Sequence, residues 1–268
     1  YPVYWAVLIG YFALLIGLWV LTGDASRFAD PQTMIRSIFL FPSDVHVIEI
    51  SWTLTIELLF YVLFAATFRG PNSDTSLVFT SMLSWAFLSV LYTVAGVDAG
   101  GLNVIFHPAV SELLFGMIIC ELWMKGMRRF ALPMFAFGAG GLLATLILVP
   151  GHELHEWRAL QAGVPAAFLV YGALGLNFRL GFLGKLFGDA SYMLYLVHLP
   201  AFMVLGFLVE KAAGISIYAN DLTMGITLVL TVVAACVLHL LFERPYQVWY
   251  KALMARFDGR EKQAHQTS

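Results

Sequence analysis

The sequence predicts an all-α membrane protein, a polytopic bundle with about eight transmembrane helices. Of its 268 residues, 60% are hydrophobic and 12% are charged, and the mean hydropathy is +0.81. Soluble domains carry about 25% charged residues. The apolar residues also gather into stretches of about 17–25 residues, the length that crosses a hydrocarbon core of ~30 Å. Composition and spacing together exclude a soluble globular domain.

The eight predicted spans follow one another along almost the whole chain. They lie at residues 3–22, 48–68, 76–96, 104–124, 131–150, 162–178, 188–210 and 222–242. Proline and glycine occur in the linkers between them, and the long first linker, 23–47, has room for a short surface helix. We expect one transmembrane domain over residues 1–243 and a cytoplasmic interfacial tail over residues 244–268.

The lysines and arginines of the linkers predict the orientation in the membrane. Cytoplasmic loops carry an excess of these residues. Eleven of the fifteen fall in alternate linkers and in the tail: Arg69, Lys125, Arg128, Arg129, Arg179, Lys185, Arg244, Lys251, Arg256, Arg260 and Lys262. Both ends of the chain are therefore predicted to face the cytoplasm, in a multi-pass protein of the cytoplasmic membrane.

Two function classes are excluded by residue usage. The few basic residues are spread thinly, so we expect no nucleic-acid partner. His152 and His155 stand close to Glu153 and Glu156, but two histidines at i and i+4 on a helix, which a zinc-hydrolase motif requires, are not present there. We expect this segment to be a solvated loop and predict no metal site.

Glu57 lies deep in the second predicted span. At ~1.5 Å per residue it is ~13 Å below a span start near Ile48, close to the middle of the bilayer. A charge at that depth costs roughly 2.5–3.5 kcal/mol, so it normally faces the protein interior and serves a function. Thr53 and Tyr61 share its helix face at i−4 and i+4.

His198 lies at a similar depth in the seventh span, ~15 Å from its start. Ser191 and Tyr195 share its helix face, and Pro200 removes the hydrogen-bond donor for the carbonyl of Leu196. An intramembrane imidazole serves as a hydrogen-bond hub, a proton carrier or a general base. The alternative is a histidine that a neighbouring helix satisfies, and position alone does not separate these interpretations.

Two further charged positions have both a functional and a structural interpretation. Glu112 is buried by its depth in the fourth span, nearer the outer face than Glu57. There it either binds substrate or joins two helices, and Gly116 one turn later is expected to allow close helix approach. Glu243 and Arg244 end the last span. They either form a charge pair at the lipid headgroups, or Arg244 binds a cytoplasmic anion.

Four motifs resemble those of the acyltransferase-3 family of integral-membrane O-acyltransferases. The segment Ser51-Trp52-Thr53-Leu54-Thr55-Ile56-Glu57, with Phe60-Tyr61, is similar to the family's Ser-Trp-Ser-Leu-x-x-Glu-x-x-Phe-Tyr segment. Residues 191–200 followed by 242–245 resemble its C-terminal signature. Tyr1-Pro2-Val3-Tyr4-Trp5 and Glu112-Leu113-Leu114-Phe115-Gly116 resemble two shorter motifs.

The resemblance implies a fold of ten helices, of which the eight spans are helices three to ten. It implies transfer of an acyl group, often acetyl, from cytoplasmic acyl-coenzyme A to a hydroxyl of an outward-facing glycan or lipid-linked sugar, with no bound cofactor. The family's catalytic histidine belongs to its first helix, so it is expected upstream of Tyr1. Residues 1–268 alone are therefore expected to be inactive.

The resemblance also distributes roles among the residues of the motifs. Glu57 and His198 are expected to support the catalytic base. The expected substrate-binding residues are Ser51, Trp52, Tyr61, Glu112, Ser191, Tyr195 and Arg244. Without the resemblance, the buried ionisable groups would equally fit a proton-coupled transporter or flippase, although the sequence contains no detectable inverted repeat. A non-catalytic scaffold is disfavoured because such groups cost stability.

Overall fold

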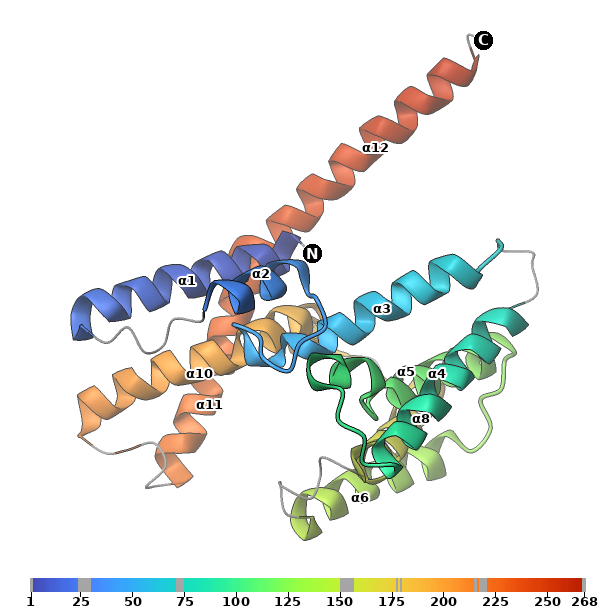
Figure 1. The fold of residues 1–268 in the computed structure, drawn as a ribbon, viewed down its shortest axis with the longest axis horizontal. Coiled ribbons are helices and arrows are strands. Elements are labelled where there is room, and N and C mark those ends of the chain that lie inside the picture. The colour runs from blue at the N-terminus through green and yellow to red at the C-terminus, as the bar shows by residue number, and fades with distance from the viewer. Residues whose placement is uncertain are drawn as a thin grey trace. The chain divides into compact units, whose positions relative to one another are not determined.

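All regular elements in the described part of the chain are helices. The computed structural model describes residues 2–23, 30–70, 75–149, 157–176, 178, 180–214, 216 and 221–266. The helices form two compact units (Figure 1). We call residues 29–179 the central unit, and residues 1–28 together with 180–268 the terminal unit. Each unit is described by itself.

The terminal unit is built from the first helix and the last third of the chain. Helix α10 packs against α11, and α1 and α9 both contact α10. The last elements, from α11 to α12, are continuous in sequence. The elements are α1 (Pro2–Thr22), α9 (Phe182–Asp189), α10 (Ser191–Ala213), α11 (Asp221–Leu238), η4 (His239–Glu243) and α12 (Arg244–Gln266).

The central unit contains the remaining helices. Helix α3 packs against α4, α4 against α5, α5 against α8, and α8 against α6. The elements are α2 (Pro31–Phe39), η1 (Glu49–Ser51), α3 (Trp52–Thr67), α4 (Ser76–Val94), η2 (Gly100–Phe106), α5 (Val110–Met124), α6 (Ala131–Leu148), η3 (Ala159–Gly163) and α8 (Val164–Leu176). A buried apolar cluster that includes Ile56, Met82 and Val110 joins α3, α4 and α5.

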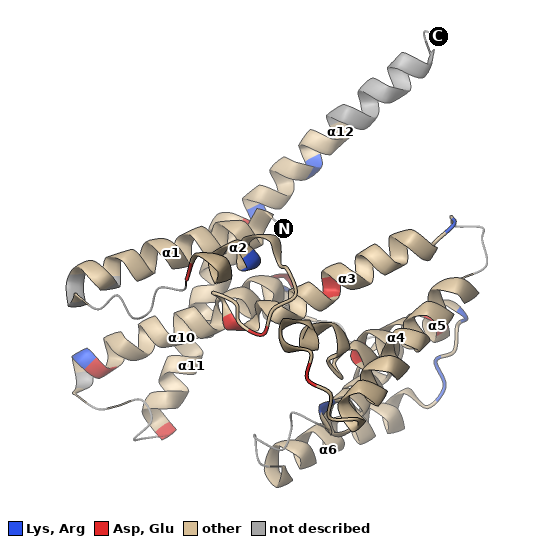
Figure 2. Cartoon of the chain, in the orientation of Figure 1, with Lys and Arg blue, Asp and Glu red and all other residues tan. Residues whose placement is uncertain are grey.

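The structure confirms the predicted membrane helix bundle. Among the described residues, seven helical runs are long and apolar enough to cross a membrane, and α1 adds a shorter apolar stretch, Pro2–Gly17. Figure 2 shows that charged residues lie mostly near helix ends and in loops, with an acidic position inside α3. Hydropathy located the spans because a helix in lipid must satisfy its own backbone and present apolar side chains.

One span boundary differs from the prediction, and one helix extends beyond its predicted span. Residues 182–189 form the separate helix α9, so the span that contains His198 starts at Ser191 and not at residue 188. The helix that contains the last predicted span continues beyond residue 242, because α11, η4 and α12 form one helical run from Asp221 to Gln266. The interfacial position of residues 244–268 stays a prediction.

The long first linker contains the expected short helix, α2. Both side-chain oxygens of its N-cap residue, Asp30, accept hydrogen bonds from the first turn, and Pro31 occupies the first helical position. Such caps satisfy amide groups that have no partner within the helix. The helix ends at Leu40, which has a left-handed conformation with φ of 52°.

Glycines bring α6 and α8 into backbone contact. A Cβ atom on Gly138 would overlap the backbone of Leu169, and one on Gly172 would overlap the backbone of Phe135. Small residues of this kind allow close packing of helices in lipid. The same role predicted for Gly116 is wrong for the described structure, because a Cβ atom there would meet nothing within 4 Å.

Among the described residues, each unit contains one π-helical turn, which ends two residues before a proline. In the central unit η3 ends at Gly163 and is followed by Pro165. A proline has no N–H to give to the carbonyl four residues earlier, which here is that of Gln161. The hydroxyl of Thr145 on α6 donates to that carbonyl instead. In the terminal unit η4 ends at Glu243, before Pro245.

Candidate substrate-binding and catalytic sites

Glu57 forms a hydrogen-bonded pair with Tyr61 on α3. The Tyr61 hydroxyl donates to Oε1 of Glu57 at 2.6 Å, across one helical turn. Glu57 is half-buried, and Tyr61 is 55% exposed within the described structure. Thr53, on the same face, donates its hydroxyl to the carbonyl of Ile50 at 3.1 Å. The expected polar face is therefore present, and its carboxylate is oriented by the tyrosine.

Ser51 has a different environment from its neighbours in the same motif. It is fully buried, and its hydroxyl donates to the carbonyl of Ile48 at 2.7 Å. This bond closes the short turn η1 that leads into α3, whose first residue is Trp52. Ser51 therefore fixes the position of Trp52, while its predicted contact with substrate is not tested by the structure.

Glu112 makes a two-point ion pair with Arg158. Nε of Arg158 donates to Oε1 of Glu112 at 2.9 Å, and Nη2 donates to Oε2 at 3.3 Å. The two side chains are 46 residues apart in sequence, and the pair connects α5 to the helical turn before η3. The arginine side chain is 38% exposed and the glutamate 31%. Paired guanidinium and carboxylate groups of this kind have a well-defined geometry.

Trp52 and His107 complete what we call the Arg158 cluster: Trp52, His107, Glu112 and Arg158. The guanidinium carbon of Arg158 lies 5.8 Å from the centroid of the Trp52 ring, within cation–π range. The rings of Trp52 and His107 have centroids 4.4 Å apart. Nδ1 of His107 accepts the backbone N–H of Ala109, so the ring proton of its neutral form lies on Nε2.

Sequence reasoning identified half of this cluster. Trp52 and Glu112 were predicted from their motifs, whereas Arg158 was placed in a linker and His107 at the outer end of the predicted span 104–124. The one available signal was that both residues are near span ends on the same predicted side of the membrane. Such a signal does not select the partner of Glu112, because several charged residues share that side.

His198 in the terminal unit bonds to its own helix. Its Nδ1 lies 2.8 Å from the carbonyl oxygen of Tyr195 and 3.2 Å from that of Leu194. A carbonyl only accepts, so Nδ1 must carry the proton and donate it. In the neutral ring, Nε2 is then the basic nitrogen. This arrangement fits both interpretations of His198 that the sequence left open.

The other predicted residues of the terminal unit have varied exposure. Tyr195 is half-buried, while Ser191 and Arg244 are exposed within the described structure. His198 and Glu57 belong to different units, so their matching depth stays a prediction.

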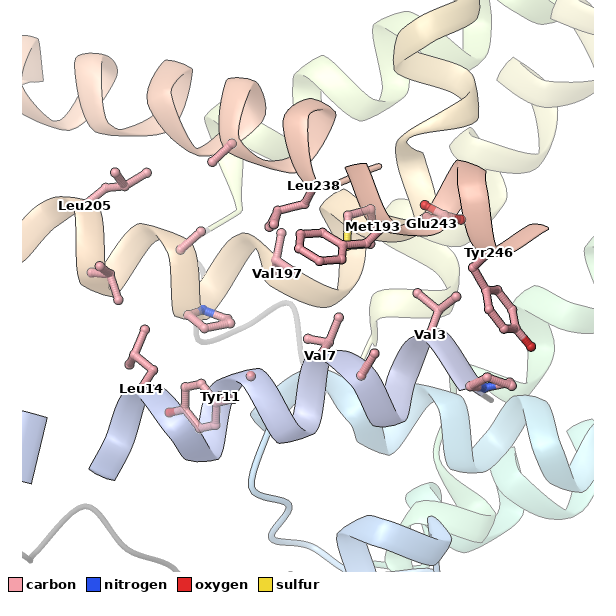
Figure 3. A pocket seen from close by; sticks show the side chains of 18 residues that line it. Val3, Val7, Tyr11, Leu14, Met193, Val197, Leu205, Leu238, Glu243 and Tyr246 are labelled. Carbon is pink, nitrogen blue, oxygen red and sulfur yellow. The ribbon is translucent and has the colours of Figure 1, made fainter. Parts of the chain in front are cut away.

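An apolar groove of about 740 Å³ crosses the terminal unit (Figure 3). Helices α1, α10 and α11 and the start of α12 line it. Figure 3 shows Glu243 and Tyr246 at one end and Leu14 and Leu205 at the other. His198 is not among the lining residues, because α10 lines the groove with the face that carries Met193 and Val197, and His198 lies ~100° around the helix from Val197.

A buried polar pair adjoins this groove. Nδ1 of His239 donates to Oε2 of Glu243 at 2.8 Å, and Gln247 donates to Oε1 at 3.0 Å. The side chains of His239 and Glu243 are only 5% and 3% exposed. Glu243 therefore does not form the exposed charge pair that the sequence suggested. His239 was not predicted, although its i, i+4 spacing from Glu243 was a readable signal.

In the described part of the chain, no group of three or more histidine, cysteine, aspartate and glutamate side chains is arranged to bind a metal ion. The loop with His152 and His155 lies outside the described residues.

Comparison with known proteins assigns the family. The model of the acyltransferase-3 family, described as an acyltransferase domain, matches residues 3–241. The chain therefore belongs to this family, and the resemblance read from its motifs is confirmed. The match includes Glu57, His198 and every member of the Arg158 cluster.

A curated relative from a bacterium adds a second comparison. The exopolysaccharide production protein ExoZ of Rhizobium meliloti (strain 1021) is 33% identical over 219 residues, which are 76% of this chain and 65% of ExoZ. The chain thus spans slightly less than two thirds of the length of this relative. No solved structure matches the chain significantly.

Proposed function

We propose that the complete protein is a membrane acyltransferase that moves an acyl group, acetyl in the simplest case, from acyl-coenzyme A to a hydroxyl of a cell-surface glycan or lipid-linked sugar. The observation that carries this proposal is the family match over residues 3–241, which contains both intramembrane ionisable residues, Glu57 and His198. The name of the relative, an exopolysaccharide production protein, supports a polysaccharide acceptor.

The reaction requires one proton transfer to a base and one from it. A base removes the proton of the sugar hydroxyl, and the oxygen attacks the carbonyl carbon of the thioester. The tetrahedral intermediate collapses, the carbon–sulfur bond breaks, and the coenzyme A thiolate takes the proton back from the base. The products are a sugar ester and free coenzyme A, with no oxidant, metal or bound cofactor needed.

Glu57 and His198 have supporting roles in this proposal. Tyr61 holds the Glu57 carboxylate in one orientation, and the backbone carbonyls of α10 fix the ring of His198. Oriented groups in a site of low dielectric stabilise developing charge without reorganising. They orient the base, which the family's first helix supplies. Arg244, exposed at the start of α12, binds coenzyme A phosphates at the cytoplasmic face.

The orientation belongs to the same proposal. The excess of basic residues in alternate linkers supports a cytoplasmic position for both ends of residues 1–268, on the side where acyl-coenzyme A is made. In this orientation Arg158 and His107 are near the outward face, toward the glycan. Donor and acceptor approach the reaction centre from opposite sides of the membrane.

The test is a transfer assay with the complete protein in membranes, using radiolabelled acetyl-coenzyme A and a purified exopolysaccharide. Glu57→Gln removes the charge and keeps the shape, so we expect at least a tenfold loss of transfer with unchanged membrane insertion. Tyr61→Phe removes one hydrogen bond worth about 1–1.5 kcal/mol, so a loss of about five- to tenfold is expected.

A matched control is Glu121→Gln, near the C-terminal end of α5. Glu121 pairs with the exposed Lys125 at 2.9 Å, one turn away. Its neutralisation changes the same charge without touching the proposed site, and transfer should be unchanged. Equal activity of Glu57→Gln and the wild type would remove Glu57 from the mechanism.

A further inference from the structure

We propose that the Arg158 cluster binds a neutral pyranose ring of the acceptor glycan through adjacent hydroxyl groups. This inference rests on the proposed function, because it specifies where and how the acceptor is recognised. The evidence is the hydrogen-bonding capacity of the cluster, its net charge, the contacts that hold it and its place in the fold.

The cluster retains free hydrogen-bonding capacity beside the ion pair. A guanidinium group has five N–H donors, and Glu112 engages one on Nε and one on Nη2. Three N–H groups remain, and the described part of the chain provides no hydrogen-bond acceptor for them. The carboxylate of Glu112 likewise retains lone pairs. With 38% and 31% of the two side chains exposed, a ligand can reach both.

The charges of the cluster select a neutral ligand. Glu112 balances Arg158, so an anion would be repelled by the carboxylate and a cation by the guanidinium. A sugar hydroxyl both donates and accepts, and two neighbouring hydroxyls can meet the guanidinium and the carboxylate together. The pair therefore fits a diol of a sugar ring better than an ionised group.

Contacts within the protein hold the cluster in its observed arrangement. The Trp52 ring lies against the guanidinium, and the carboxylate holds it at two points. The π-helical turn η3 follows Arg158 directly, and Gly163 leaves space for Glu112, since a Cβ atom there would lie 3.2 Å from its Cγ. Preorganised groups bind with a smaller entropic cost, and π-helical turns occur frequently at functional sites.

The cluster also lies where an outward-facing acceptor would arrive. Trp52 is the first residue of α3, Glu112 is near the start of α5, and Arg158 precedes η3. Trp52 and Arg158 are at the ends of spans on the side that the basic linkers predict to face outward, and Glu112 lies deeper, within the candidate span Gly100–Met124. An ion pair whose only purpose was to join α5 to η3 would not need to be so exposed.

The experiment compares two charge-swapped double variants of the complete protein. The Glu112→Arg, Arg158→Glu double variant keeps an ion pair between the same two positions but exchanges donor and acceptor sides. The control is the Glu121→Lys, Lys125→Glu double variant, which exchanges the exposed pair at the other end of α5. Thermal unfolding, the KM for an exopolysaccharide acceptor and the KM for acetyl-coenzyme A are measured for both.

We expect the swap at positions 112 and 158 to raise the acceptor KM at least tenfold, with the donor KM within twofold of the wild type. The control swap should change neither constant. A swap at positions 112 and 158 that restores both wild-type stability and wild-type acceptor KM would overturn the inference and leave the pair as a structural link.

A second variant and a direct binding measurement keep the inference testable if the swap does not fold or if no transfer occurs. Arg158→Lys keeps the charge and loses the planar fork, so it should weaken binding of a neutral oligosaccharide from the same exopolysaccharide at least fivefold. Binding is measured without donor. Wild-type binding without transfer would contradict the proposed function alone, while equal binding by wild type and Arg158→Lys would contradict this inference alone.

Discussion

The central and terminal units each place a hydrogen-bonded side-chain pair at the same backbone feature. Both contain a five-residue π-helical turn followed, after one residue, by a proline. In the central unit, the adjacent arginine reaches across to Glu112 on another helix, and the pair stays partly exposed. In the terminal unit, His239 and Glu243 lie at the two ends of the turn itself and are almost fully buried.

The comparison shows that the exposure of a side-chain pair helps to distinguish a stabilising role from a ligand-binding role. A buried pair costs desolvation, and removal of one partner leaves an uncompensated polar group. A partly exposed pair contributes little stability, but its remaining donors and acceptors can meet a ligand. We therefore assign a stabilising role to the His239–Glu243 pair and a binding role to the Arg158 cluster.

The largest stability effect is expected for the buried pair. His239→Leu should destabilise the protein by roughly 3–5 kcal/mol, because the buried carboxylate of Glu243 loses its hydrogen bond from His239 and keeps only the one from Gln247. Replacing both residues with leucine should recover much of that loss, since no buried charge remains. Glu112→Leu should cost about 1 kcal/mol or less because the Arg158–Glu112 pair is partly exposed. Thermal unfolding in one detergent compares the three variants.

This part of the comparison would fail if His239→Leu and Glu112→Leu shifted the unfolding temperature equally. It would also fail if the double leucine variant were less stable than His239→Leu alone.

The next effect concerns the α6–α8 contact, which supports η3 in the central unit. Gly138→Ala places a methyl group against the backbone of Leu169, so we expect a loss of about 1–3 kcal/mol. Gly140→Ala, on the same helix, is the matched control because its methyl group would meet nothing within 4 Å. Thermal unfolding should separate the two variants clearly, and equal stability would show that the helices are not in such close contact.

A smaller effect is expected from the Thr145 hydroxyl, which donates a hydrogen bond to the Gln161 carbonyl that Pro165 leaves without a backbone donor. Thr145→Val removes the donor to the carbonyl of Gln161, which should cost about 1–2 kcal/mol. Thr145→Ser keeps the hydroxyl and serves as the control. Because η3 positions Arg158, Thr145→Val should also raise the acceptor KM, whereas an unchanged KM would separate the turn from the binding site.

The smallest effect is a dependence of central-unit stability on pH. Burial lowers the pKa of His46, in the loop after α2, below the usual value for histidine, against a smaller opposing effect from a hydrogen bond with the backbone of Ser43. The unfolded chain therefore binds a proton at a higher pH than the folded one, so stability is complete above about pH 6.5 and falls as the pH decreases below that value. His46→Gln should flatten the slope of unfolding temperature between pH 7 and pH 5, and an unchanged slope would assign it to other groups.

The sequence predicted the helical spans well because lipid imposes a simple constraint on length and polarity. The family motifs also directed attention to Glu57, Trp52 and Glu112, whose surroundings the structure then described. Hydropathy did not reveal that α12 continues α11, because a helix can continue past the apolar stretch that identifies a span.

The partners of these residues were harder to predict. The Arg158–Glu112 contact joins positions 46 residues apart, and only the fold selects it from several charged pairs. The π-helical turns depend on where freed carbonyls find donors, such as Thr145, which is a tertiary property. The i, i+4 spacing of His239 and Glu243 indicates that they can pair. The surrounding residues are apolar, so His239 was interpreted only as part of a membrane span.

The proposed acyl transfer is tested most directly in sealed, inside-out membrane vesicles that contain the complete protein. Radiolabelled acetyl-coenzyme A is added outside, at the former cytoplasmic face, and exopolysaccharide is trapped inside. We predict base-labile radiolabel on the trapped glycan, with loss of at least nine tenths of it in Glu57→Gln. Movement of unmodified glycan across the membrane, with all label remaining on coenzyme A, would contradict the account and favour a transporter.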